Sequence, residues 1–538
     1  MKGTRYVLIL TLLALMVVGT ACERGEEESH GTSVETQALA AQATPLSTVV
    51  SPTKTPTVTP TKRPTPTPAP TATPTPVPIG QSRSNPVPVG EVYQTPNWEM
   101  QVLEVKRGDA AWVDIQLANR YSDPPSKGME YVLVKLRVKN IGAEDTAKTI
   151  NYGAFVLTGD RNLVYRQWSM WGAPKPELNA ELYPGGETEG WLMMQAGAGE
   201  SNLILMYEEN WEAPPRFLAL EEGAKVVPGT VEPCEGLSMT TRSEPAPLGE
   251  KLCAGSWEIQ VLEVTRGADA WAALQIADDM NRPPDQGMEY ILARLRVGNT
   301  GTQDIATDIG NDDFALTGDR SLVYRQWSTW GVPEPELNAE LYPGGETEGW
   351  VRMQTSAGDS NPILMYEEDW DGNVRFLALE EGAKVVPGTV GPCEGLSATT
   401  RSQPAPFGER VCAGSWEIQV LEVVRGMDAW AALQIESDMN RPADQGMEYV
   451  LVKLRARNIS STEEPIRLSE GYFASIGDKN VVYDPRSVHL SSPAIGDVRY
   501  FPGGEYEGRL ALQCADGESN LLAVLRLNSG GNAFLALQ

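Results

Sequence analysis

Two long segments alternate apolar and polar residues with the period of a β-strand. Between 98 and 105, the apolar Trp98, Met100 and Val102 alternate with polar side chains. Between 131 and 139, aliphatic residues alternate with lysine and arginine in the same way. A period of two is typical of a strand that buries one face. Shorter segments predict further strands at 153–157, 162–166, 187–195, 203–207 and 216–220.

A different pattern separates the two long strands. Trp112 and Ile115 are three positions apart within 109–119, which is helical spacing, so we predict a short helix there. Pro184-Gly185-Gly186 has proline at the first corner of a turn and glycine where φ must be positive. This combination predicts a type II turn before the strand at 187–195.

The whole pattern occurs three times at a fixed interval. Trp98, Trp257 and Trp416 are equally spaced, since 257 − 98 and 416 − 257 are both 159. The Gly-Met-Glu-Tyr and Pro-Gly-Gly-Glu motifs recur at the same interval. A fixed period indicates tandem copies of one structural unit. Short strands, many turns and one helical insertion per copy predict an antiparallel β-sandwich, with a closed barrel as the alternative.

A set of packing and turn residues marks the first copy: Trp98 to Glu104, Arg107-Gly108, Trp112, Asn119, Pro124, Gly128-Met129-Glu130-Tyr131 and Asn140. This set resembles the immunoglobulin-like domain-of-unknown-function family of bacterial lipoproteins and secreted antigens. The resemblance recurs in all three copies and implies an all-β chain of three tandem immunoglobulin-like antiparallel β-sandwiches, each with a short helical insertion. It implies no activity and no cofactor, because its motifs are packing and turn residues.

The first residues have the features of a secretory signal peptide, which we place at 1–21. Lys2 and Arg5 precede an apolar run, and small residues precede Cys22. The Gly19-Thr20-Ala21-Cys22 sequence resembles a bacterial lipobox, although Gly19 stands where that pattern favours leucine. Lipidation of Cys22 would tether the protein to a membrane, and secretion without a lipid is the alternative. Both place the rest of the chain outside the cytoplasm.

Residues 22–85 are expected to form a linker. From about 44 to 78 the chain is almost entirely Thr, Pro, Ser, Val and Ala. Such a composition cannot bury a core, so we expect a disordered, extended stalk. The three repeats are then predicted at 86–233, 234–392 and 393–538.

The chain is strongly acidic, which limits its partners. It has 72 Asp and Glu residues against 44 Lys and Arg residues, for a net charge of −28. This excess of negative charge would repel a polyanion, so we expect no nucleic-acid partner.

The cysteines cluster where one repeat meets the next. Cys234 and Cys253 are separated by 19 positions, as are Cys393 and Cys412, since 253 − 234 and 412 − 393 are both 19. We predict a disulfide within each pair and an unpaired Cys514. Pairing of Cys253 with Cys393 and of Cys412 with Cys514 is an alternative that spacing leaves open. No Cys-x-x-Cys motif or histidine cluster accompanies them, which argues against a zinc site.

The 14 tryptophans fall into two types. The positions of Trp98 and Trp112 are occupied in every repeat, so we predict that they pack in the core. At other positions the third repeat has Arg486, His489 and Arg509 instead, which favours an exposed location. The candidates for a ligand-binding surface are Trp168, Trp171, Trp191, Trp211, Trp327, Trp330, Trp350 and Trp370.

Strand parity supports this interpretation for one candidate. Trp191 alternates onto the same face as Glu187 and Glu189, which predicts that it points outward. Exposed indole rings beside polar groups are typical of surfaces that bind sugars or peptides. The alternative is that these rings pack on one another as a satellite cluster.

The sequence offers few residues suited to catalysis. His30 and His489 are the two histidines, so a Ser-His-Asp site in every repeat is excluded. We therefore expect a non-enzymatic, surface-displayed lipoprotein for binding, adhesion or structural spacing, with carbohydrate or a surface protein as its partner and no metal site. A carboxylate-dependent hydrolase of surface polymers is one alternative. An accessory lipoprotein of a transporter or envelope assembly is another.

Overall fold

Every repeat folds into two facing antiparallel sheets, and the long alternating strands form the centre of the first sheet. The computed structural model describes residues 77–166, 171–210, 213–325, 331–368, 374–388, 390–490, 493–527 and 531–538. These parts of the chain contain thirty strands and three α-helices. The predicted class, three β-sandwiches with a short helical insertion each, is confirmed.

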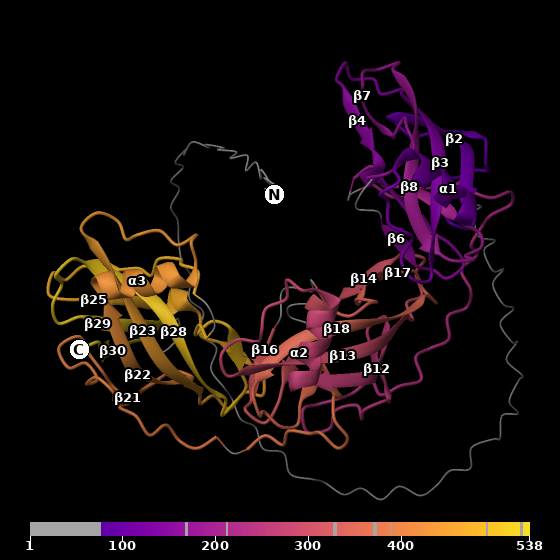
Figure 1. The fold of residues 1–538 in the computed structure, drawn as a ribbon. Helices are drawn as coiled ribbons and strands as arrows, with labels where there is room; N and C mark the ends of the chain where they lie inside the picture. The colour runs from indigo at the N-terminus through magenta and orange to yellow at the C-terminus, as the bar shows by residue number, and fades with distance from the viewer. Residues whose placement is uncertain are drawn as a thin grey trace, which may run out of the picture. The chain divides into compact units, whose positions relative to one another are not determined.

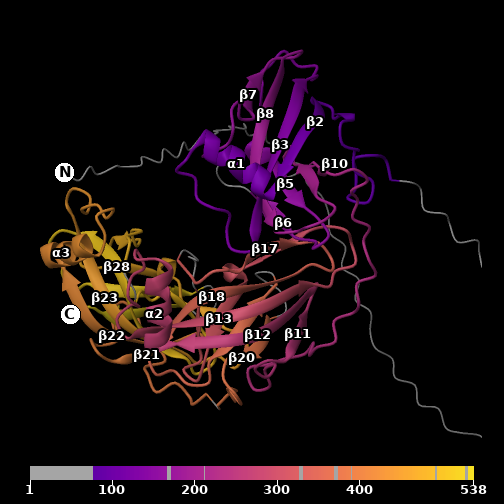
Figure 2. The same cartoon turned by 45° about the vertical axis from the view of Figure 1, so that its right-hand side comes forward.

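Repeat 1 shows the arrangement that the other two copy (Figures 1 and 2). Its first sheet contains, in spatial order, β1 (Val92–Gln94), β2 (Trp98–Arg107), β3 (Met129–Asn140) and β8 (Glu187–Gly197). Its second sheet contains β10 (Arg216–Ala219), β9 (Ile204–Tyr207), β5 (Phe155–Thr158) and β6 (Val164–Arg166). A two-stranded ribbon pairs β4 (Lys148–Asn151) with β7 (Asn179–Leu182), and helix α1 (Gly108–Ala118) follows β2.

Repeat 2 has the same elements. Its first sheet contains β11 (Lys251–Ala254), β12 (Trp257–Arg266), β13 (Met288–Asn299) and β18 (Glu346–Ser356). The second sheet contains β20 (Val374–Ala378), β19 (Ile363–Glu367), β15 (Phe314–Thr317) and β16 (Leu322–Tyr324). The ribbon pairs β14 (Thr307–Gly310) with β17 (Asn338–Leu341), and helix α2 is Gly267–Ala277.

Repeat 3 completes the series. Its first sheet contains β21 (Arg410–Ala413), β22 (Trp416–Arg425), β23 (Met447–Asn458) and β28 (Glu505–Ala515). Its second sheet contains β26 (Val482–Tyr483), β25 (Phe473–Ile476), β29 (Leu522–Leu527) and β30 (Gly531–Ala536). The ribbon pairs β24 (Ile466–Arg467) with β27 (Val498–Tyr500), and helix α3 is Gly426–Glu436. A single 3-10 turn precedes the second sheet in each repeat, at Tyr152–Ala154, Asn311–Asp313 and Glu470–Tyr472.

The core of each sandwich lies between the two sheets and contains the first tryptophan of the repeat. Trp98, Trp257 and Trp416 are 2%, 4% and 4% exposed, which confirms their predicted core position. The prediction that Trp112 also packs in this core was wrong, because Trp112 belongs to helix α1 on the outer side of the first sheet. Trp112 is half-buried and stacks on Tyr131 with the ring centroids 5.7 Å apart.

The predicted strands agree with the structure within a few residues, but three short strands were not predicted. β1, β4 and β7 are three or four residues long, too short for alternation to distinguish them from loops. The predicted turn is present, because Gly185 has a φ of +85° and Gly186 N donates a hydrogen bond to Tyr183 O at 2.8 Å.

Repeat 1 begins earlier than its predicted boundary at 86. Phe217 N donates a hydrogen bond to Gly80 O at 3.0 Å, and Arg83 is 0% exposed. The described residues 77–85, expected to belong to the stalk, thus pack on the second sheet. The rest of the stalk, the signal peptide and Cys22 lie outside the described residues.

Repeats 1 and 2 are joined through the second sheet of repeat 1. In this contact, which we call joint 1–2, Tyr342 of repeat 2 is 3% exposed and packs on Ile204 and Met206. Tyr342 N donates a hydrogen bond to Asn162 O at 2.8 Å. The Arg83 guanidinium lies 3.6 Å from the centre of the Tyr342 ring.

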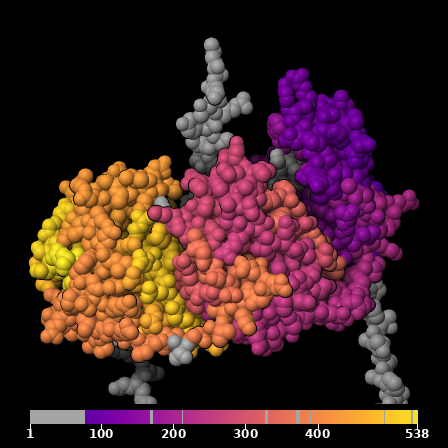
Figure 3. All heavy atoms as spheres, turned by 60° about the horizontal axis from the view of Figure 1, so that its bottom comes forward, coloured from indigo at the N-terminus to yellow at the C-terminus, as the bar shows by residue number. Residues whose placement is uncertain are grey.

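Repeats 2 and 3 meet in the same way, at joint 2–3. Phe501 is 3% exposed, its N–H donates to Ser321 O at 2.9 Å, and Arg242 lies 3.9 Å from the centre of its ring. Here β16 also pairs with β27, so that one six-stranded sheet crosses the joint. Figure 3 shows the atoms of the two repeats in contact. The three sandwiches therefore contact one another within one compact unit, whose described residues run from 77 to 538.

Candidate binding surface

Each helix lies on the outer face of the first sheet, opposite the sandwich core (Figure 1). Gly108 leaves β2 with a φ of +56°, a left-handed conformation that glycine adopts without strain and that turns the chain into α1. Ala111 and Ile115, four positions apart, face the sheet and are 0% exposed. The equivalent pairs, Ala270 with Leu274 and Ala429 with Leu433, are also 0% exposed.

Apolar residues away from that buried face are exposed at the end of every helix. Leu117, Ile276 and Ile435 occupy equivalent positions and are 80%, 87% and 87% exposed. Four residues further on, a second large side chain is exposed in each repeat: Tyr121 at 66%, Met280 at 80% and Met439 at 66%. We call each such pair a helix-end surface. Its recurrence in three repeats distinguishes it from an isolated exposed apolar residue, which is common on proteins.

A loop of the same repeat is fixed against each helix end. In repeat 2, Asn281 Nδ2 donates to Leu274 O of the helix and to Gly331 O of the loop, both at 2.7 Å. In repeat 3, Asn440 Nδ2 donates to Leu433 O at 2.8 Å and to His489 O at 2.9 Å. The helix end and the loop are thus positioned together in both repeats.

This loop supplies an exposed aromatic residue in repeat 1 and one wall of a pocket in repeat 2. Trp171 is 66% exposed, and the next residue, Gly172, packs so closely on Ser122 that a Cβ would not fit there. In repeat 2 a pocket of about 530 Å³ is bounded by Ile276 from α2 and by Val332 from the loop. That volume lies in the range of ligand sites.

The prediction that Trp191 is exposed was wrong. Trp191 is 8% exposed and packs with Ile115, Tyr131 and Met193 beneath α1. Its parity on the outward face of β8 was correct, but α1 covers that end of the strand. The outward face of β8 is exposed to solvent only near Glu189. There, hydrogen bonds from Arg137 and Lys135 lower the pKa of the Glu189 carboxyl group. Trp350, the equivalent residue in repeat 2, is half-buried in the same way.

In repeat 3 the buried tryptophan is replaced by an ion pair. Arg509 occupies the position of Trp191 and pairs with Glu436 of α3, whose side chain is 10% exposed. The first two repeats have Ala118 and Ala277 where repeat 3 has Glu436. Arginine replaces the tryptophan here because Glu436 neutralises its charge, so the replacement does not indicate an exposed site. Arg486 pairs with Asp444 at 2.7 Å, and His489 is exposed.

Five of the eight candidate tryptophans lie outside the described residues: Trp168, Trp211, Trp327, Trp330 and Trp370. Of the other three, Trp171 alone is exposed. The described residues thus do not form the predicted tryptophan surface. The helix-end surfaces were not predicted, although the sequence contains a signal for them, since Leu117 and its two equivalents break the spacing of the buried helix face.

Buried carboxyl groups in the described residues serve structural contacts. Burial raises the pKa of four of them, Asp313, Glu340, Asp359 and Glu470. Glu340 pairs with Arg166 at 2.7 Å, and Asp359 accepts a bond from Arg320 N at 3.2 Å. None of the four is among the residues that bound the pocket at Ile276 and Val332. The described residues contain no group of three or more His, Cys, Asp or Glu side chains that could hold a metal ion.

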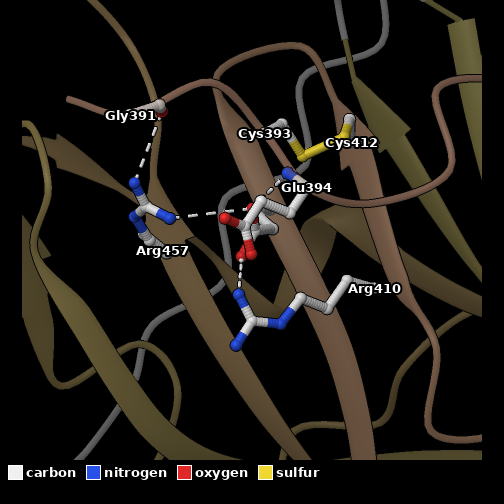
Figure 4. The surroundings of a disulfide bond; sticks show 7 residues. Gly391, Cys393, Glu394, Arg410, Cys412 and Arg457 are labelled. Carbon is white, nitrogen blue, oxygen red and sulfur yellow. Dashed lines mark hydrogen bonds and ion pairs between the residues drawn. A yellow bond between two sulfur atoms is a disulfide. The ribbon is translucent and has the colours of Figure 1, made fainter.

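Both predicted disulfides are present, Cys234–Cys253 and Cys393–Cys412. Each connects the segment before the first strand of a repeat to that strand. Figure 4 shows Cys393–Cys412 with Glu394, Arg410 and Arg457 beside it. Arg410 of β21 binds Glu417 of β22 at 2.7 Å, and Glu417 is 4% exposed.

Cys514 forms no disulfide and is buried. Burial raises the pKa of its thiol to about 11, which keeps the thiol protonated at neutral pH.

Within the described residues, every helix is too short or too polar to span a bilayer. No family model matches the chain, and no curated protein matches it. Among solved structures, the crystal structure of an uncharacterized β-sandwich protein from Clostridium difficile 630 aligns over 28% of this chain and 100% of its own length. The identity is 12% and the TM-score 0.17, too low to support an argument about function.

Proposed function

We propose that this protein is a non-enzymatic binding protein displayed outside the cell, and that its helix-end surfaces contact apolar segments of a partner protein. The observation that carries the proposal is the threefold recurrence of two large, exposed apolar side chains at the end of each helix. Contact of these apolar side chains with water is unfavourable, and it occurs in all three repeats. Recognition of a partner would explain why they are exposed.

The types of side chain favour a protein partner over a carbohydrate. Sugar binding by stacking requires flat aromatic rings, and repeats 2 and 3 expose isoleucine and methionine instead. Methionine is enriched in protein interfaces and adapts to varied apolar partners. Trp171 and Tyr121 in repeat 1 add aromatic anchors of the type that often dominates binding energy.

Three weak sites on one chain can bind a repetitive partner much more tightly than one site does. Linked binding events occur at a high effective concentration, so avidity exceeds the affinity of a single repeat. Joints 1–2 and 2–3 hold neighbouring repeats in contact, which supports simultaneous binding by several helix-end surfaces.

The proposed location is the outer surface of a membrane, through a lipid on Cys22. The signal-like start of the chain supports this, and the two disulfides are typical of an oxidising compartment. We expect Cys22→Ser to move the protein from the membrane fraction to the medium. Fractionation of cells with immunodetection measures this, and a variant that stays in the membrane fraction would contradict lipidation at Cys22.

The binding surface is tested by placing charges on it. Each lost anchor removes about 1.5–3 kcal/mol of apolar burial, so we expect the triple variant Leu117→Asp, Ile276→Asp and Ile435→Asp to bind apolar peptides at least about tenfold more weakly. Peptides selected from a displayed random library against the unaltered protein provide the probe, and titration calorimetry provides the affinities.

The helices offer a matched control. Gln116, Gln275 and Gln434 each precede one of these apolar residues and are exposed, so their change to Asp adds the same charge beside the surface. Unaltered binding by this control is expected. Equal weakening in both triple variants, or selected peptides without apolar anchors, would argue against the helix-end surfaces. Retention on polysaccharide that depends on Trp171 would assign a glycan instead.

A further inference from the structure

Joints 1–2 and 2–3 use the same positions of the repeat. The inserted aromatic residue, Tyr342 or Phe501, directly precedes the Pro-Gly-Gly turn, and its equivalent in repeat 1 is Tyr183. The arginine that covers the ring, Arg83 or Arg242, has its equivalent in Arg401 of repeat 3. Every repeat thus has a donor end with the aromatic residue and an acceptor face with the arginine. Among the described residues the three repeats form two joints, and one donor end and one acceptor face lie outside both; we call these two the unused donor and the unused acceptor.

The unused donor is exposed and matches the donor of joint 1–2. Tyr183 is 64% exposed, whereas Tyr342 is 3% exposed. In joint 1–2, Asp304 pairs with Arg83 at 2.5 Å and Glu340 pairs with Arg166 at 2.7 Å. Repeat 1 has the same residue types at the equivalent positions of its own donor end, Asp145, Glu181 and Tyr183.

The unused acceptor is exposed along its edge strand. Val481, just before β26, and Val482, its first residue, are 47% and 52% exposed. The equivalent Leu322 and Val323 are both 1% exposed beneath joint 2–3. In repeat 2 the equivalent strand, β16, pairs with β27 of the next repeat. β26 presents the same edge, and an open edge recruits another strand.

The arginine of the unused acceptor is already positioned. Arg401 donates to Asn480 Oδ1, as Arg83 donates to Asn162 Oδ1 at 2.7 Å in joint 1–2. Arg401 is exposed, whereas Arg83 is 0% exposed. The floor of the acceptor is likewise apolar, consisting of Ala474, Leu522 and Val524 with the half-buried Phe534.

The charges around the unused acceptor suit the acidic donor. In repeat 1, Arg166 lies beside Glu208 and binds the Glu340 of the donor. In repeat 3 the two charges change places: Asp484 occupies the position of Arg166, and Arg526 occupies that of Glu208. The two side chains pair at 2.8 Å. Arg526 is therefore available for the Glu181 of an incoming donor, where Arg166 serves in joint 1–2.

From these matches, we propose that the chain associates head to tail, with the Tyr183 end of repeat 1 docking on the second sheet of repeat 3 in a second copy. Leu182 of one copy pairs with Val481 of the next in the register of joint 2–3, and Tyr183 lies under Arg401. The two surfaces differ, so the contact is heterologous and can extend beyond a dimer. The internal joints are favoured by their covalent linkage, so the contact between copies is weaker and depends on concentration.

Sedimentation velocity of the chain from residue 23 onward tests this. We expect the average mass to rise above that of one chain between about 10 µM and about 1 mM. Tyr183→Glu removes the donor and Arg401→Glu removes the acceptor, and each variant alone is expected to stay monomeric. Mixing the two restores one intact contact, so the mixture is expected to form dimers and no larger species.

Tyr121→Glu is the matched control, because Tyr121 is 66% exposed in the same repeat and lies outside the donor end. Association of this variant like the unaltered protein supports the proposal. A monomeric unaltered protein at the highest concentration, continued association of the Tyr183→Glu variant, or a monomeric mixture would each overturn it. Loss of association in Tyr121→Glu alone would assign self-association to the helix-end surface instead. Circular dichroism confirms that each variant is folded.

Discussion

Replacement of Trp416 by alanine is expected to destabilise repeat 3 by about 3–5 kcal/mol, the cost of an unfilled cavity in a core. Trp416 is 4% exposed and meets Tyr500 edge to face, with the centroids 5.0 Å apart. Because Tyr500 belongs to β27, the same change is expected to loosen the sheet across joint 2–3. Urea denaturation followed by amide exchange in β22 and β23 measures the loss for this repeat.

An exposed tryptophan provides the comparison. Trp171→Ala removes a side chain that is 66% exposed, so we expect a change within about 0.5 kcal/mol. A loss below about 1 kcal/mol for Trp416→Ala would show that Trp416 does not fill the core as described.

Replacement of Glu367 by alanine is expected to open joint 2–3, at a cost of about 3–5 kcal/mol. The Glu367 side chain is 5% exposed and binds both Arg325 and Arg499. Burial lowers the pKa of both guanidinium groups, and the positive charge of Arg499 lowers that of Arg325 further. Without the carboxylate, two half-buried positive charges would face each other.

Joint 1–2 contains the control for this prediction. There one arginine, Arg166, binds two carboxylates, Glu208 at 2.8 Å and Glu340 at 2.7 Å. Glu208→Ala leaves the pair with Glu340 intact, so a loss of about 1 kcal/mol or less is expected. Amide exchange of β16 and β27 reports opening of joint 2–3. Equal effects of the two substitutions would mean that the charge balance of the joint is unimportant.

The sandwich fold could be predicted because its signals are local. Alternation in 98–105 and 131–139, the fixed interval between copies and the Pro-Gly-Gly turn each depend on a few neighbouring residues. The disulfides followed from the placement of cysteines at the junctions. Strands such as β7, four residues long, gave no comparable signal.

The functional surface could not be predicted in the same way, because exposure depends on what covers a face. Parity placed Trp191 outward correctly, and α1 then buried it. The exchange of Trp191 for Arg509 suggested exposure because the compensating residue, Glu436, is distant in sequence. The joints had one visible sign, an aromatic residue before each Pro-Gly-Gly turn, but its burial depends on contact with another repeat.

Successive repeats join by inserting one aromatic residue into the preceding sheet, and amide hydrogen exchange tests this insertion most directly. The Tyr342 and Phe501 N–H groups donate to Asn162 O and Ser321 O, so both are expected to exchange slowly. At a concentration where the chain is monomeric, the amide of the exposed Tyr183 is expected to exchange much faster. Equally fast exchange at all three positions would contradict the joints and the account that rests on them.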